Sequence, residues 1–156
     1  MKGIFNLLLD ELSKLNYNIK WKSLNSVYYN LPQSRQRIII FGVRRDLGKD
    51  PIFPTPDDQF ILVKDVLPDI DFHSRGQFDQ SLKNTNSFFH TLTKSPSMYF
   101  IKGGEKIKPT INELKLIQGF PDDFIFKGNY NQIWGMIGNS VPPPIMYRFG
   151  QIINEI

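Results

Sequence analysis

Apolar residues near the start of the chain first recur at helical spacing and then alternate with polar ones. Four apolar side chains share one stripe of a helix: Ile4, Leu8, Leu12 and Leu15. We therefore expect an amphipathic helix over residues 4–15. Three more alternate with polar neighbours: Tyr17, Ile19 and Trp21. A period of two predicts a half-buried strand directly after the helix.

A second strand is predicted where the apolar residues no longer alternate. Residues 38–41 (Ile-Ile-Ile-Phe) are continuously apolar and mostly β-branched, which is typical of a strand covered on both faces within a sheet. The sequence offers this strand one clear neighbour, the strand near Ile19. Two strands alone are marginally stable, and an open apolar edge favours further pairing. We therefore expect a partner at this edge, either another polypeptide or a second copy of the chain.

Residues 48–108 have the composition of a separate, loop-rich lobe. Prolines punctuate its first part, and polar stretches follow. Short apolar pieces at 60–63 and 98–101 predict small strands or docked loops. Gly103-Gly104 is typical of a hairpin turn.

Helical signals return after residue 108. Thr110-Ile111-Asn112-Glu113 is a capping-box pattern, which predicts a helix to about residue 117. A second helix is expected over residues 130–137, and a third after Pro142-Pro143, because proline is tolerated in the first turn. The predicted fold class is α/β, in three parts: 1–47 with a helix and two strands, the lobe 48–108, and a helical return to the first part over 109–156.

Composition narrows the class of protein without identifying it. The 156 residues carry a formal charge of +4 and a pI near 9.3, which permits an anionic partner such as DNA but does not require one. The sequence contains no cysteine, so it offers no disulfide, no zinc–cysteine site and no thiol nucleophile. No apolar run approaches the roughly 20 residues that span a bilayer, and the first residues lack a signal-peptide pattern. We expect a cytoplasmic protein.

Two segments carry candidate chemistry, and the first is the entry to the apolar strand. Arg35 and Arg37 occupy alternate positions there, so their side chains are expected on one face. Guanidinium donors on that face could hold a phosphate or the carbonyl edge of a base. Gln33, two residues earlier, can both donate and accept. The alternative is a basic strand end that faces solvent.

The second segment is the loop at residues 138–142, Gly-Asn-Ser-Val-Pro, which precedes the last predicted helix. Asn139 or Ser140 is a candidate cap for that helix. Free backbone amides at the start of a helix favour carboxylates and other anionic groups. The alternative is a plain capped turn.

Three segments, taken in order, resemble the closing motifs of one enzyme family. Residues 24–37 (Leu-Asn-Ser-Val-Tyr-Tyr-Asn-Leu-Pro-Gln-Ser-Arg-Gln-Arg), 118–122 (Gln-Gly-Phe-Pro-Asp) and 138–142 resemble the eighth, ninth and tenth motifs of the cytosine-5 DNA methyltransferases. The resemblance covers nearly the whole chain, and the loop-rich lobe takes the place of the target-recognition domain. It implies part of a Rossmann-like, S-adenosylmethionine-dependent methyltransferase sheet plus a small recognition domain of short strands, in a DNA methylation or restriction–modification system.

The resemblance implies roles for both candidate segments. The arginine that matches Arg37 helps to hold a cytosine flipped out of the duplex, because the target atom is unreachable within the stack. Gln33 and Arg35 belong to the same wall of that active site. The cofactor segment forms part of the S-adenosylmethionine pocket and consists of Asn139, Ser140 and Val141.

Two further features concern the recognition lobe and its partner, double-stranded DNA. Thr91-Leu92 resembles a threonine–leucine pair that lies beside the DNA, although His90 stands where a proline is common. In the ninth motif Glu113 is retained, but Asn112 and Leu116 replace arginines that brace the lobe against the catalytic core. These departures put the stability of that brace in doubt.

The first six motifs of the family are absent from the sequence. They include the glycine-rich cofactor loop, the Pro-Cys-Gln nucleophile and the Glu-Asn-Val glutamate. Met1-Lys2-Gly3 resembles the residues that come directly after Glu-Asn-Val, so we expect the C-terminal part of an enzyme, inactive alone and completed by an N-terminal half or by self-association. The assembly would transfer a methyl group to cytosine C5 through a covalent thioether. The alternative is a non-enzymatic DNA-binding or interaction remnant.

Other candidate residues receive structural interpretations. His73 and His90 are isolated, and we interpret them as solvated or capping histidines, so no metal site is predicted. Phe88-Phe89 and Tyr99-Phe100 are predicted to form the core of the lobe, the alternative being a platform on which bases stack.

Overall fold

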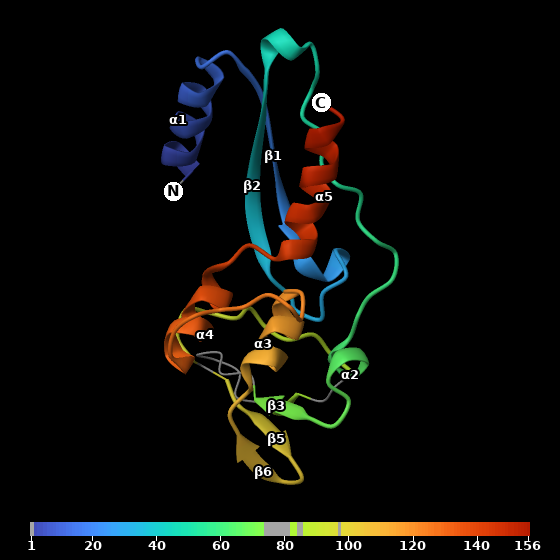
Figure 1. Cartoon of the computed structure of the whole chain (residues 1–156). Helices are drawn as coiled ribbons and strands as arrows, with labels where there is room; N and C mark the ends of the chain where they lie inside the picture. The colour runs from blue at the N-terminus through green and yellow to red at the C-terminus, as the bar shows by residue number, and fades with distance from the viewer. Residues whose placement is uncertain (1, 74–81, 84–85, 97) are drawn as a thin grey trace.

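The computed structural model describes residues 2–73, 82–83, 86–96 and 98–156. Figure 1 shows an elongated molecule with two ends. One end holds a long antiparallel hairpin with a helix on either side of it. The other end holds short strands and the remaining helices. The chain crosses between the two ends several times, and the functional candidates lie at these crossings.

The hairpin end begins with the predicted helix, α1 (Lys2–Ser13), followed by β1 (Tyr17–Asn25) and β2 (Gln36–Arg44). Both strand predictions are confirmed. The helix stops two residues before its predicted end, and Asn16 turns the chain in the left-handed region with φ 59°. β1 and β2 pair over their whole length, from Tyr17 opposite Arg44 to Asn25 opposite Gln36.

The outer edge of β2 is unpaired among the residues that the structure describes, because the sheet contains only β1 and β2. The open edge expected for this strand is therefore present, and the strand is not covered on both faces in this chain. Ile38 is 55% exposed, and Ile39, Ile40 and Phe41 are only partly buried.

One face of the hairpin packs on the C-terminal helix α5 (Pro143–Asn154). Phe149 of α5 meets two phenylalanines edge to face, Phe41 at 5.5 Å and Phe53 at 5.7 Å between ring centroids. Such aromatic pairs add about 0.5–1.5 kcal/mol beyond their buried area. The third predicted helix is therefore confirmed, with prolines in its first turn.

The other end contains a four-stranded antiparallel sheet in the order β4-β3-β5-β6. Its elements are short: α2 (Val63–Val66), β3 (Asp71–His73), β4 (Leu82–Lys83), β5 (Phe100–Lys102) and β6 (Glu105–Ile107). Gly103 and Gly104 form the predicted turn with φ of 58° and 83°. The prediction of short strands within residues 48–108 is thus confirmed, whereas the single-turn helix at Val63 was not predicted.

Two helices connect this sheet to the hairpin end. α3 (Ile111–Gln118) starts with the predicted capping box, in which the Thr110 hydroxyl accepts from the Glu113 amide at 3.2 Å and the Glu113 carboxylate accepts from the Thr110 amide at 2.6 Å. Gly119 ends the helix in the left-handed region with φ 82°. α4 (Tyr130–Asn139) follows, as expected.

The larger hydrophobic core joins α3 and α4 to the lobe. Its fully or nearly buried members are Val63, Ile70, Phe72, Phe89, Leu92, Met98, Phe100, Leu114, Ile117, Ile133, Trp134 and Ile137. Phe89 and Phe100 are completely buried, which confirms the core interpretation of these two phenylalanines. Packing therefore crosses the predicted boundary at residue 108, and the three-part division of the chain stays a prediction. No helix in the described part of the chain is long and apolar enough to cross a membrane.

Candidate functional site at the junction of the two ends

The segment from Leu31 to Arg35 carries the first candidate residues and ties the two ends together. Its backbone pairs with the lobe, since the Ser34 amide donates to the Phe89 carbonyl at 2.7 Å and the Phe89 amide donates to the Pro32 carbonyl at 2.7 Å. On the hairpin side the Ser26 amide donates to the Arg35 carbonyl at 3.1 Å. Side chains of this segment are therefore held rigidly between the lobe and the hairpin.

Gln33 lies completely buried in this segment and uses both ends of its amide group. Its Oε1 accepts from the Leu92 amide at 3.0 Å. Its Nε2 donates to the Gln118 Oε1 at 2.8 Å and to the Ile117 carbonyl at 3.3 Å. A buried polar side chain needs such partners, because an unpaired one costs about 1–3 kcal/mol. Gln33 therefore joins the recognition lobe to α3 and does not face an open cavity.

Gln118 extends this connection to the predicted cofactor segment. It is also completely buried, and its Nε2 donates to the Ser140 Oγ at 2.9 Å and to the Ser140 carbonyl at 3.0 Å. The three polar residues form one relay, Gln33–Gln118–Ser140, which runs from the lobe to the α4–α5 connection. The sequence marked Gln118 only as the first residue of a motif and gave it no role. The local signal for a structural role of Gln118 was its position directly before Gly119, the glycine that caps the C-terminus of α3.

Replacing Gln118 with leucine is expected to lower the free energy of unfolding by about 2 kcal/mol, because it leaves Gln33 Nε2 with only its longer bond and removes the donor to Ser140. Gln118→Glu should cost more, since a carboxylate would face the Ser140 carbonyl oxygen. Urea unfolding measures both. The matched control is Gln151→Leu on the exposed side of α5, which should stay within about 0.5 kcal/mol of the parent.

Arg35 is buried, with 3% of its surface exposed. Its Nη1 donates to the Leu92 carbonyl at 2.8 Å and its Nη2 donates to the Gly138 carbonyl at 2.9 Å. Burial lowers the pKa of Arg35 to about 10, and the nearby positive charge of Arg37 adds to this effect. The guanidinium is therefore still protonated at neutral pH and clamps the lobe to the end of α4.

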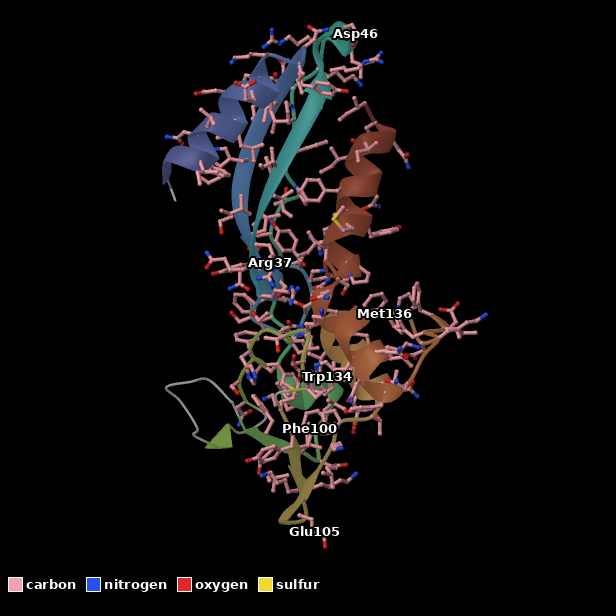
Figure 2. All side chains as sticks on the ribbon, turned by 90° about the vertical axis from the view of Figure 1, so that its left-hand side faces the viewer. Arg37, Asp46, Phe100, Glu105, Trp134 and Met136 are labelled. Carbon is pink, nitrogen blue, oxygen red and sulfur yellow. The ribbon has the colours of Figure 1, made fainter. Side chains whose placement is uncertain are left out.

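Arg37 behaves differently from Arg35 because it lies within β2 and is exposed. Within the described residues its one hydrogen bond runs from Nη1 to the neighbouring Gln36 carbonyl, at 2.7 Å. Figure 2 shows Arg37 where the hairpin meets the other end of the molecule. The two arginines thus do not line one open surface together. Arg37 alone presents guanidinium donors to solvent at the junction.

The predicted DNA-contact pair lies against the same segment. Thr91 is half-buried, and its hydroxyl donates to the Ser34 carbonyl at 3.0 Å. The Leu92 side chain is 2% exposed and belongs to the larger core, while its backbone bonds to Gln33 and Arg35. A role of these two residues beside DNA stays a prediction, and in this structure the Leu92 side chain has no free surface for it.

The predicted cofactor segment forms the connection between α4 and α5. Asn139 is the last residue of α4 and Ser140 is its C-cap, whereas the N-cap of α5 is Pro142 without a side-chain bond. The expectation that Asn139 or Ser140 caps α5 is therefore wrong, because α4 continues further than predicted. The Ser140 hydroxyl is used by Gln118 and Ile137. The side chains of Asn139 and Val141 are exposed, Val141 to 43%.

Of the two histidines, the structure describes the side chain of His90. Both ring nitrogens of His90 are buried without a partner among the described residues, so the solvated or capping interpretation is wrong for His90. Burial lowers the pKa of His90, because it disfavours the charged form of the ring. The side chain of His73 lies outside the described part of the structure. Within the described residues no group of acidic or histidine side chains could hold a metal ion.

The fold is a partial α/β domain with a small attached lobe. The chain matches the family model for C-5 cytosine-specific DNA methylases over residues 2–102 and 102–155. It belongs to this family, which confirms the resemblance of its three motif segments. Enzymes of the family use S-adenosylmethionine.

Known relatives agree with this assignment. The chain is 30% identical to the Type II methyltransferase M.DsaV of Dactylococcopsis salina, over 93% of this chain and 50% of that protein. It is 26% identical to the Type II methyltransferase M.MthTI of Methanothermobacter thermautotrophicus, over 97% and 60%. The Entamoeba histolytica methyltransferase EhMeth has a similar fold, with a TM-score of 0.59 at 16% identity, over 97% of this chain and 58% of that structure. The chain thus spans about half the length of the curated relatives it matches.

Proposed function

We propose that this chain supplies the DNA-recognition lobe, the arginine side of the cytosine site and one edge of the cofactor pocket in a DNA cytosine-5 methyltransferase. The observation that carries the proposal is the buried network of Gln33, Arg35, Gln118 and Ser140. It gathers all three motif segments at one junction. Among the exposed side chains of these segments are those of Arg37, Asn139 and Val141.

Arg37 is the residue that would contact the flipped cytosine. A guanidinium presents several donors in a fixed plane, which suits a carbonyl oxygen of a base or a phosphate oxygen. Arg35 lies behind it as a positioning residue, since both of its Nη atoms are used by backbone carbonyls. Gln33 acts indirectly, because its side chain forms hydrogen bonds with Leu92 and Gln118.

Asn139 and Val141 would form one edge of the S-adenosylmethionine site. Their exposed side chains offer an amide and a small apolar surface, which fit the polar and apolar parts of that cofactor. Ser140 holds the edge in place through Gln118. When bound, S-adenosylmethionine supplies the methyl group, and the rest of its site comes from residues outside these 156.

The nucleophile must also come from elsewhere, because the 156 residues contain no cysteine. A partner carrying the thiol would pair with the open outer edge of β2. The apolar surface of this strand suits such a partner, since Ile38 is 55% exposed. Burial of apolar surface stabilises such a complex by about 25 cal/mol per Å². Strand pairing also provides hydrogen-bond partners for the backbone N–H and C=O groups at the open edge.

The test mixes the purified chain with a polypeptide that carries the Pro-Cys-Gln and Glu-Asn-Val motifs. Tritium transfer from labelled S-adenosylmethionine to cytosine in duplex DNA is measured. We expect transfer by the mixture and none by either polypeptide alone. A chain that binds DNA but restores no transfer with such halves would instead be a non-enzymatic DNA-binding module. Self-association of the chain, seen by sedimentation, would show that a second copy covers β2.

Arg37→Ala is expected to reduce methyl transfer by the mixture about 100-fold, because it removes a preorganised charged donor at the cytosine. The matched control is Arg44→Ala at the opposite end of β2, where the arginine pairs with Asp46 at 2.7 Å on the surface. That control should leave the rate unchanged. Equal rates of methyl transfer for the two variants would show that Arg37 has no role at the cytosine site.

A further inference from the structure

A groove along the exposed side of α4 takes no part in the buried network of the junction. Its volume is about 680 Å³, and it is lined by Lys94, Lys127, Asn129, Asn131, Gln132, Gly135, Met136 and Asn139. We propose that this groove, apart from Asn139 at its cofactor end, binds the phosphate backbone of duplex DNA and is a second anchoring point beside the recognition lobe. The inference rests on the proposed function, since DNA is the substrate there.

The groove follows one face of α4. Its helical members recur at the spacing of a single face: Asn131, Gln132, Gly135, Met136 and Asn139. The opposite face consists of the buried Ile133, Trp134 and Ile137. Figure 2 labels Trp134 and Met136, which belong to these two faces. No residue of α4 carries a charge, so the electrostatics of the groove come from residues beside the helix.

The charges beside the helix are positive. Lys94 and Lys127 are both exposed, and neither forms an ion pair within the described part of the chain. None of the eight lining residues is acidic. Lysine ammonium groups bind phosphates as point charges. An open groove with two cations and no carboxylate therefore favours a polyanion.

The side-chain amides of Asn129 and Gln132 can each donate hydrogen bonds into the groove. Asn129 Oδ1 accepts from the Gln132 amide at 3.0 Å, and Gln132 Oε1 accepts from the Asn129 amide at 2.9 Å. This capping box uses the oxygen of each side chain. The NH₂ groups remain, and among the described residues neither has an acceptor. Phosphate oxygens accept hydrogen bonds and do not donate them, so they complement these groups.

Two glycines hold Lys94 on this face. A Cβ at position 135 would lie 3.3 Å from the Lys94 carbonyl oxygen, and one at position 138 would overlap the Thr93 carbonyl. The Trp134 Nε1 donates to that carbonyl at 3.0 Å. The segment 93–94 is therefore clamped on α4. It directly follows Thr91-Leu92, the pair that the resemblance places beside DNA.

The test measures binding of a fluorescein-labelled duplex of mixed sequence to the full chain by anisotropy at several salt concentrations. We expect Lys94→Gln/Lys127→Gln to weaken binding about 10-fold and to reduce the slope of log K against log salt by about 1.8, since each phosphate contact contributes about 0.9. The Lys94→Arg/Lys127→Arg variant should retain both values. Thermal unfolding should match the parent, because both lysines are exposed.

The control is Lys14→Gln/Lys22→Gln, which removes the same charge from exposed positions on the hairpin end. It should change the salt slope little. A loss equal to that of the groove variant would show general charge attraction and overturn the groove proposal, while leaving the proposed function intact. If the parent chain binds no duplex even at low salt, both the groove and the DNA-recognition role of this chain are wrong.

Discussion

Arg35→Ala is expected to lower the free energy of unfolding by about 4 kcal/mol, since hydrogen bonds to charged groups contribute about 1.5–3 kcal/mol each. The variant removes the two bonds of Arg35 to Leu92 and Gly138, at 2.8 and 2.9 Å. It also leaves both carbonyls without their charged donor at a buried site and creates a cavity between the lobe and α4. Urea unfolding, followed by tryptophan fluorescence, measures the loss.

Two further variants separate the clamp from the charge. Arg37→Ala removes the same charge from an exposed position and should stay within about 0.5 kcal/mol of the parent. Arg35→Lys keeps the charge, but one ammonium cannot span both carbonyls as the planar guanidinium does, so about half of the loss is expected, roughly 2 kcal/mol. If Arg35→Ala and Arg37→Ala unfold at the same urea concentration, the clamp contributes nothing to stability.

The sequence predicted those elements whose signals are local. α3 has its capping box within four consecutive residues, Thr110 to Glu113, and a glycine at its end. In the hairpin, β1 shows its period of two and β2 its continuous apolar run within nine residues each. The single-turn helix at Val63 was missed, because four residues are too few to show a helical period. The family assignment was also predictable, since it depends on contiguous motif residues.

The arrangement of the site was not predictable from local patterns. Arg35 and Arg37 look alike in the sequence, yet one is buried and the other exposed. Their difference is decided by carbonyls that lie 57 and 103 residues further along the chain. The Gln33–Gln118 bond spans 85 residues. No period or spacing rule reports such pairings, because they arise only when the lobe, α3 and α4 pack together.

The same packing explains why α3 and α4 were predicted as a simple return to the hairpin end. Their amphipathic patterns show that each has a buried face but not which core receives it. In the structure Leu114, Ile117 and Trp134 face the core of the lobe. The two helices thus pack directly on the lobe. As a result, Gly138 and Ser140 lie beside the segment that contains Gln33 and Arg35.

Gly138→Ala is expected to be the most destabilising change in α4, with a loss of about 3–5 kcal/mol from overpacking and broken hydrogen bonds. The added Cβ would overlap the Thr93 carbonyl oxygen and lie 2.6 Å from its carbon. These are backbone atoms, so the segment 92–94 must move away from the helix. That movement breaks the bond from Trp134 to the Thr93 carbonyl and pulls Leu92 away from Arg35.

Three glycines give a graded series that isolates this contact. Gly150→Ala in α5 meets nothing within 4 Å and should stabilise the chain by about 0.5–1 kcal/mol, because alanine is the better helix former. Gly135→Ala, with its Cβ 3.3 Å from the Lys94 carbonyl oxygen, should fall between the two. The urea midpoint should be highest for Gly150→Ala, lower for Gly135→Ala and lowest for Gly138→Ala.

A double-mutant cycle between Gly138→Ala and Arg35→Ala tests whether both act on one clamp. Arg35 donates to the carbonyls of Leu92 and of Gly138 itself, so either change alone already loosens the same contacts. The combined loss should therefore be smaller than the sum of the single losses by about 1–3 kcal/mol. If the two losses in the free energy of unfolding are strictly additive, the glycine contact and the arginine clamp stabilise the junction independently. Segment 92–94 would then be held by two separate sets of contacts.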